Sequence, residues 1–267
     1  MTIRTPEDEA AIDATKAPLL DHLVELRKRI IYSLAALAIA FILCFSFAKP
    51  IYAFLTEPLA RAAPGHHLIY TAVYESFFTY VKLGMFAGLC LAFPIIASQV
   101  WMFVAPGLYK QERKAFLPFL IATPILFLIG AAFVFYVMLP FAIRFFVGYE
   151  TPGGPNSLPI EMQPKVSEYL DFVTTLIFAF GLTFQLPVLL SLLGRVGIVT
   201  SQQLKSARRY AILGITVVAA ILTPPDFISP FTLILPLIFL YEASIWCVKL
   251  IERQRARDDA AKAAAAT

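Results

Sequence analysis

Two acidic side chains stand inside strongly basic stretches of the sequence. Glu25 belongs to residues 22–29, which read His-Leu-Val-Glu-Leu-Arg-Lys-Arg, and Glu112 is followed directly by Arg-Lys. A carboxylate can accept a guanidinium group through two parallel hydrogen bonds, so two carboxylates on one surface are suited to binding arginine side chains. Alone, each residue is weak evidence, because Glu25 can equally pair with Arg29 one helical turn later, for about 0.5 kcal/mol at most.

Polar residues within or beside the long apolar stretches form a second set of candidates, since polar groups in lipid are costly. Glu75 and Lys82 are seven residues apart and share one helix face, where a salt bridge or snorkelling to the interface is an equally good explanation. Gln185 lies in the middle of an apolar stretch, where an amide can hydrogen-bond a partner helix for about 1 kcal/mol. Asp226 follows Thr-Pro-Pro, where a role as a turn residue is favoured.

The sequence contains no recognised catalytic or metal-binding pattern. The 3 cysteines stand singly in apolar stretches, and the 3 histidines lie outside the stretches that could span a membrane. Neither the zinc-protease HExxH motif, nor the hydrolase GxSxG motif, nor a phosphate-binding P-loop motif occurs. We therefore expect a protein that is not an enzyme, binds no metal or other cofactor, and has no nucleic-acid partner.

The elements that must position these residues are membrane-spanning helices. Hydrophobic residues make up 59% of the chain and charged residues 15%, against about half and about a quarter in typical soluble domains. A hydrocarbon core about 30 Å thick is crossed by roughly 20 apolar residues of helix, and six stretches approach that length. They are residues 31–48, 76–104, 115–143, 172–193, 210–222 and 227–248. The sequence thus predicts an all-α polytopic membrane protein with six spans, of which the fifth is the shortest.

The positions of the basic residues predict the orientation, because cytoplasmic loops collect lysine and arginine. Most of the 22 Lys and Arg residues fall in the N-terminal segment, the second and fourth loops and the C-terminal tail. The first, third and fifth loops carry only Lys49, Arg61, Arg144 and Lys165. We expect both termini in the cytoplasm, with a polar arm over 1–17, a single membrane domain over 18–252 and a flexible cytoplasmic tail over 253–267.

Local features refine this picture at three places. Residues 19–30 have apolar side chains at helical spacing with charges opposite, which predicts an amphipathic helix leading into the first span. Several predicted spans contain prolines, among them Pro94 and Pro187, which are expected to kink them. The long third loop, 148–168, is rich in proline and glycine and is expected to form an ordered cap on the outer side.

Several motifs together resemble one family of membrane proteins. Residues 22–29 resemble the N-terminal HLxELRxR signature of TatC, the multi-spanning receptor of the twin-arginine protein translocase. Further matches follow in the same order as in that family, and they extend over roughly residues 18 to 252. They include 57–59 (Glu-Pro-Leu), 99–101 (Gln-Val-Trp), 103–109 (Phe-Val-Ala-Pro-Gly-Leu-Tyr), 112–113 (Glu-Arg), 187–188 (Pro-Val) and 223–226 (Thr-Pro-Pro-Asp).

The resemblance implies a concave, glove-like fold of six helices. It also implies that the protein binds signal peptides with paired arginines and helps to move folded proteins across the bacterial cytoplasmic (inner) membrane. By the family pattern, Glu25 and Glu112 contact the arginine pair, with Arg27 and Phe103 supporting that site. Pro58 is expected to shape the outer cap, to which Asp226 also belongs.

Partner proteins follow from the same resemblance. The family works with small single-span proteins of the TatA and TatB type, and this chain is expected to form a homo-oligomer within a larger complex. Many members carry a glutamate where this chain has Gln185, so we expect a hydrogen bond to a partner helix there rather than a titrating group. A secondary transporter is the alternative, because transporters also have kinked helices and buried polar groups.

Overall fold

Long helices follow the apolar stretches of the sequence. The computed structural model describes residues 6–104, 113–154, 157–222 and 228–265, and within these ranges its only β-pairing consists of isolated bridges. The expected all-α fold is therefore confirmed. In chain order the helices are α1 (Pro6–Ser46), α2 (Ala48–Ala62), α3 (Glu75–Val104), α4 (Arg113–Phe133), the π-helical turn η2 (Val134–Met138), α5 (Leu139–Val147), α6 (Val166–Thr183), α7 (Leu186–Val196), α8 (Ser201–Ser206), α9 (Arg208–Leu222) and α10 (Ile228–Ala265).

Among the residues that the structure describes, five helical segments are long and apolar enough to cross a membrane, as expected of a multi-pass protein. They are His22–Ser46, Glu75–Phe103, Pro118–Val147, Val166–Arg195 and Pro230–Arg257. Helix α9 has only 15 residues, or about 22 Å of helix, which is less than a hydrocarbon core of about 30 Å. Because α9 corresponds to the short fifth stretch of the sequence, the count of six spans stays a prediction.

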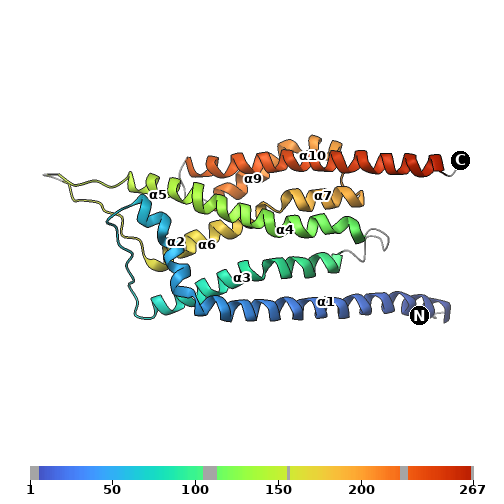
Figure 1. The fold of residues 1–267 in the computed structure, drawn as a ribbon, viewed down its shortest axis with the longest axis horizontal. Helices are drawn as coiled ribbons and strands as arrows, with labels where there is room; N and C mark the ends of the chain where they lie inside the picture. The colour runs from blue at the N-terminus through green and yellow to red at the C-terminus, as the bar shows by residue number, and fades with distance from the viewer. Residues whose placement is uncertain (1–5, 105–112, 155–156, 223–227, 266–267) are drawn as a thin grey trace, which may run out of the picture.

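The long helices run along the long axis of the molecule (Figure 1). Helix α1 packs on α3 at one side, α10 packs on α7 and α9 at the other, and α4 packs on α6 between them. Helix α2 instead crosses one end of the bundle, at the left in Figure 1. The free ends of α1 and α10 both lie at the opposite end, which is the arrangement that an even number of crossings produces.

The two terminal helices extend beyond the apolar stretches. Helix α1 is continuous from Pro6 to Ser46, so the amphipathic helix expected over 19–30 runs directly into the first span. Helix α10 continues to Ala265 and covers most of the segment 253–267. The division into an arm, a membrane domain and a tail stays a prediction.

Prolines interrupt two of the long helical segments. Pro187 has no backbone N–H to donate to the carbonyl of Thr183, and the chain breaks there into α6 and α7. Pro140 likewise cannot bond to Tyr136, and the turn before α5 widens into the π-helix η2. The expected kink at Pro187 is thus present, whereas Pro94 stays inside an uninterrupted α3.

Helix α1 leaves much of its apolar surface uncovered by protein. Ile39 is 70% exposed and Ile42, one helical turn later, is 65% exposed. Contiguous apolar surface of this kind marks a face that water does not normally wet. Such a face is suited to contact with lipid or with a partner helix, as on a membrane-spanning helix.

A close approach of two backbones fixes α1 against α3. A Cβ atom added at Gly88 of α3 would lie 2.8 Å from the backbone nitrogen of Phe41 and 2.9 Å from its Cα. Small residues allow membrane helices to touch in this way. The contact sets how the start of α1 lies against the end of α3, where several candidate site residues are found.

Backbone hydrogen bonds hold the described residues of the loop between α5 and α6, as expected for an ordered cap. Thr151 and Ile160 exchange backbone hydrogen bonds of 3.0 and 2.9 Å and form a short hairpin. The amide of Val166 donates to the carbonyl of Ile69 at 2.9 Å, which ties the loop before α6 to the loop before α3. This cap lies at the same end of the bundle as α2 (Figure 1).

Candidate functional site

The end of the bundle that carries both chain ends brings Glu25 against α3 through a single arginine. Arg29 donates to Glu25 Oε1 at 3.1 Å and, through its other terminal nitrogen, to Gln99 Oε1 at 3.2 Å. The two charged side chains are partly exposed, 31% for Glu25 and 25% for Arg29. The Glu25–Arg29 pair considered from the sequence is therefore present, and Glu25 already accepts a guanidinium group.

Phe103 lies at the same end and makes a second contact between α1 and α3. Its ring stacks on that of His22, with ring centroids 4.3 Å apart and ring planes 19° from parallel. His22 precedes Glu25 by three residues, which places it on the neighbouring turn of α1. The structure thus brings Glu25 and Phe103 to one end of the α1–α3 pair.

Of the two further candidates for this site, the structure describes one. Arg27 is exposed and makes no ion pair with a carboxylate in the part of the chain that the structure describes. Glu112 lies outside the described residues, directly before Arg113, the first residue of α4. The role of all four residues as a signal-peptide site stays a prediction.

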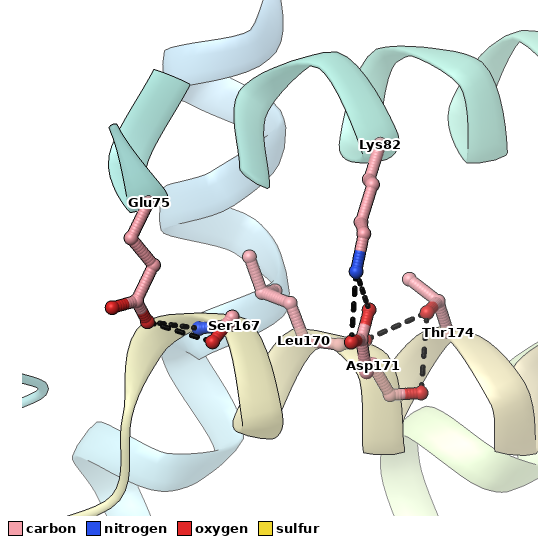
Figure 2. Close-up of polar contacts among 6 residues, drawn as sticks. All are labelled: Glu75, Lys82, Ser167, Leu170, Asp171 and Thr174. Atoms are coloured by element: carbon pink, nitrogen blue, oxygen red, sulfur yellow. Dashed lines mark hydrogen bonds and ion pairs between the residues drawn. The ribbon is translucent and has the colours of Figure 1, made fainter. Parts of the chain in front are cut away.

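Lys82 and Glu75 pair with α6 rather than with each other, as Figure 2 shows. Lys82 Nζ lies 3.0 and 3.2 Å from the two carboxylate oxygens of Asp171. Glu75 accepts hydrogen bonds from the hydroxyl of Ser167 at 2.6 Å and from its amide at 3.3 Å. The second oxygen of Glu75 accepts from the amide of Thr71 at 2.8 Å. These contacts join α3 to the first turns of α6, so both residues hold two helices together near the cap.

Gln185 bridges the break between α6 and α7 to helix α4. Its Nε2 donates to the backbone carbonyl of Thr123 at 2.9 Å and to that of Gly181 at 3.4 Å. Its Oε1 is buried and has no hydrogen-bond donor among the described residues. The side chain therefore has one acceptor left for a further donor.

The structure describes one of the two residues expected in the outer cap. Pro58 is buried within α2, and it lines a hollow of about 200 Å³ between α2 and the η2–α5 segment. Asp226 lies outside the described residues. Pro58 therefore belongs to the helix that crosses the end of the bundle, whereas the role of Asp226 stays a prediction.

A histidine–carboxylate pair that the sequence analysis missed connects the two loops of the cap. His66 Nε2 lies 2.6 Å from Glu150 Oε1, and His66 Nδ1 lies 3.2 Å from the carbonyl oxygen of Ala63. Both ring nitrogens thus face acceptors, which only the protonated imidazolium can satisfy together. The same Glu150 oxygen accepts the amide of Met162 at 2.8 Å. The pair fixes the base of the hairpin against the loop that follows α2.

The protonation of this pair follows from its contacts. The hydrogen bond to Glu150 raises the pKa of His66 above its ordinary value of 6.5, with a smaller contribution from the charge of Glu161. The amide of Met162 and then the His66 ring lower the pKa of Glu150 below 4.5. His66 therefore stabilises the folded cap at low pH and loses this effect as pH rises through its folded pKa, while Glu150 loses its effect as pH falls through its own.

We expect the hairpin to be held most firmly between about pH 5 and pH 6.5 and to loosen above the folded pKa of His66. The measurement is hydrogen–deuterium exchange of residues 149–163, expressed as protection factors at about pH 5.5 and pH 8.5. Protection should fall at the higher pH in the wild type and should be low at both values in His66→Gln. His67→Gln is the matched control, and equal protection of the wild type at both pH values would contradict the role of His66.

Sequence reasoning missed the Lys82–Asp171 and His66–Glu150 pairs because each joins residues that are far apart in the chain. Asp171 lies at the edge of the fourth apolar stretch, directly before Phe172, and its charge near the span was the only signal that it could neutralise Lys82. His66 and Glu150 are 84 residues apart and lie in loops with no regular spacing. Their pairing depends on how the bundle brings the two loops together.

The chain is similar to known proteins of one family. The family model described as Sec-independent protein translocase protein (TatC) matches residues 21–236. A protein of Magnetococcus marinus named Sec-independent protein translocase protein TatC is 46% identical over 250 residues, which cover 93% of this chain and 90% of that one. A protein of the same name from Rickettsia prowazekii is 42% identical over 237 residues, covering 88% of this chain and 94% of that one.

Solved structures agree with the sequence relatives. A crystal structure described as the twin arginine translocase receptor TatC superposes with a TM-score of 0.73 at 35% identity, covering 86% of this chain and 99% of that one. A second crystal structure of that receptor, in the detergent DDM, gives the same TM-score at 36% identity. Both the fold and the sequence thus point to one assignment. The chain is a multi-pass membrane protein that belongs to the TatC family of Sec-independent protein translocase proteins.

Proposed function

We propose that this protein is the receptor subunit of a twin-arginine export system and that it holds the arginine pair of a signal peptide where the middle of α1 meets the C-terminal end of α3. The observation that supports this most directly is the contact of Glu25 with the guanidinium group of Arg29. A carboxylate that already accepts one guanidinium has the geometry to accept another. Glu112 is proposed to bind the second arginine of the pair.

The proposed binding step is an exchange of arginines. One arginine of the signal peptide displaces Arg29 from Glu25, while Arg29 keeps its hydrogen bond to Gln99. The exchange is inexpensive, because partly exposed ion pairs contribute only about 0.2–1 kcal/mol. The stacked rings of His22 and Phe103 offer an aromatic face beside the site, on which a guanidinium can lie.

The proposed placement in the membrane has both termini in the cytoplasm of a bacterium and the cap on the outer side of the inner membrane. Residues 18–252 form the membrane domain in this proposal. The end of the bundle where α1 and α10 have their free ends carries the basic segments (Figure 1). This agrees with the tendency of cytoplasmic segments to collect lysine and arginine. A receptor of this kind carries out no reaction on its cargo, in keeping with relatives that are named as translocase proteins.

Small single-span proteins of the TatA and TatB type are the proposed partners. Gln185 is the proposed site of one contact, because it is partly exposed and its Oε1 has no donor among the described residues. The side chain must turn for this buried oxygen to accept from a partner helix. We further propose that several copies of this chain work within one complex.

The experiment that tests the receptor proposal compares two signal peptides. The purified full-length protein in detergent is titrated with a labelled peptide that carries the arginine pair and with one that carries two lysines instead. Lysine keeps the charge but lacks the planar fork of donors, so we expect the arginine peptide to bind at least about tenfold more tightly, equivalent to about 1.4 kcal/mol. Equal binding of the two peptides contradicts the proposal and favours a transporter of small solutes.

A further inference from the structure

The end of α2 and the η2–α5 segment enclose a second site of distinct chemistry. The hollow there has a volume of about 200 Å³ and is lined by Glu57, Pro58, Arg61, Ala62, Phe135, Tyr136, Pro140 and Arg144. Two of its lining residues are arginines and one is a carboxylate, which gives the hollow a net positive charge. Arg61 pairs with Glu57 one helical turn earlier. Arg144 is exposed and makes no ion pair with any carboxylate that the structure describes.

The position of the hollow places it where a membrane ends. Arg144 lies near the last residue of the apolar segment Pro118–Val147, and α2 crosses the bundle at that same end (Figure 1). In the turns of the same segment that precede Arg144, apolar side chains face outward: Tyr136 is 67% exposed, Val137 49% and Phe141 43%. A ligand in the hollow would therefore have charged groups at its head and an apolar surface beside its tail.

We propose that this hollow binds the head group of a membrane phospholipid, with the phosphate between Arg61 and Arg144. Guanidinium groups bind phosphate through paired hydrogen bonds. The two positive charges of Arg61 and Arg144 balance the single negative charge of a phosphodiester and that of Glu57. The carboxylate of Glu57 then accepts a hydrogen bond from the group beyond the phosphate. Ethanolamine and glycerol head groups carry such a donor, whereas choline carries none.

The hollow is separate from the proposed signal-peptide site, because α2 and α5 lie at the opposite end of the bundle from the C-terminal end of α3, to which Phe103 belongs (Figure 1). A bound lipid at this place would join α2 to α5 and hold the crossing helix at the membrane surface. The inference requires only that this end of the bundle meets a membrane boundary, and it does not depend on which side of the membrane that is.

Native mass spectrometry of the full-length protein released from detergent tests the proposal. The protein is titrated separately with phosphatidylglycerol, phosphatidylethanolamine and phosphatidylcholine of identical acyl chains. We expect the first bound lipid to associate about tenfold more tightly for the first two lipids than for phosphatidylcholine. In Glu57→Gln this preference should fall to within about twofold, because the neutral amide oxygen is a weaker acceptor than the carboxylate.

Variants of the arginines test the phosphate contact. Arg144→Gln and Arg61→Gln are each expected to weaken phosphatidylglycerol binding about tenfold. Arg144→Lys keeps the charge and should lie between Arg144→Gln and the wild type, which covers the case in which the glutamine variant does not fold. Lys49→Gln is the matched control, since Lys49 is an exposed cation of the same helix α2 that does not line the hollow.

Three results would overturn the proposal. If Lys49→Gln weakens binding as much as Arg144→Gln, the lipids respond to general charge and not to the hollow. If glycerol 3-phosphate displaces the lipid at equal concentration, the hollow binds a soluble phosphate ester rather than a membrane lipid. If phosphatidylcholine binds as tightly as the other lipids and Glu57→Gln has no effect, the assigned role of Glu57 is wrong.

Discussion

Replacing Glu25 with glutamine is expected to weaken binding of a twin-arginine signal peptide at least about tenfold, whereas replacing Arg29 with glutamine is expected to strengthen it. Glutamine keeps the shape of Glu25 but removes the charge, and hydrogen bonds to charged groups contribute about 1.5–3 kcal/mol. Arg29→Gln removes the guanidinium that now occupies Glu25 at 3.1 Å. Since a partly exposed pair contributes about 0.2–1 kcal/mol, the gain should be up to about fivefold.

The two substitutions are expected to change the peptide's affinity in opposite directions, although the residues are only one helical turn apart, and this makes the comparison informative. Fluorescence anisotropy with a labelled peptide in detergent measures both dissociation constants. Lys28→Gln is the matched control, because Lys28 lies beside Arg29 and its ammonium is 5.9 Å from the ring centroid of Tyr32 rather than near Glu25. If Lys28→Gln strengthens binding as much as Arg29→Gln does, the effect is general electrostatics. If Arg29→Gln weakens binding as Glu25→Gln does, Arg29 supports the site and is not displaced from it.

The sequence was sufficient to predict the long membrane-crossing segments, because each is an apolar stretch whose length matches the hydrocarbon core of a membrane. It did not predict α2 or α8, which lie in segments interpreted as loops. The short fifth stretch illustrates the limit of that reasoning. Hydropathy identifies α9 as apolar, but its 15 residues do not establish that it crosses a membrane. A kink at Pro187 could also be predicted, since a proline removes a specific backbone hydrogen bond. The same reasoning predicted one at Pro94, which stays inside an uninterrupted α3, so the lost bond alone does not determine where a helix breaks.

The sequence named Glu25 and Phe103 as candidates for one site, and the structure places both at one end of the α1–α3 pair, while their role in binding a signal peptide stays a prediction. The sequence showed Glu25 within a basic run, and the alternative pairing with Arg29 followed from helical spacing alone. It did not show that Arg29 also reaches Gln99, because that contact joins residues 70 positions apart. Contacts between helices depend on how the helices pack, and periodicity along one helix carries no information about that.

The same reason explains the pairs near the cap. Glu75 and Lys82 share a helix face, so the sequence favoured a contact between them or with the interface. In the structure, each finds a nearer partner on α6, as Figure 2 shows for Ser167 and Asp171. An intramembrane charge predicts that some partner exists, but only the packed bundle determines which one it is.

Replacing Gly88 with alanine is expected to destabilise the protein by about 1–3 kcal/mol, although alanine is the better helix former by about 1 kcal/mol. The new methyl group would lie 2.8 Å from the backbone nitrogen of Phe41 and 2.9 Å from its Cα. Backbone atoms cannot rotate away as the end of a side chain can, so α1 must move off α3. Unfolding by heat or denaturant in detergent measures the change in stability.

Gly214→Ala is the matched control, because a Cβ atom at Gly214 in α9 meets no atom within 4 Å. This variant should be as stable as the wild type or slightly more stable. The Gly88→Ala variant should also lose part of its preference for the arginine peptide, since the Arg29–Gln99 and His22–Phe103 contacts cross the same α1–α3 interface. If both variants have equal stability and bind the arginine peptide alike, the close approach of α1 and α3 does not hold the receptor site in place.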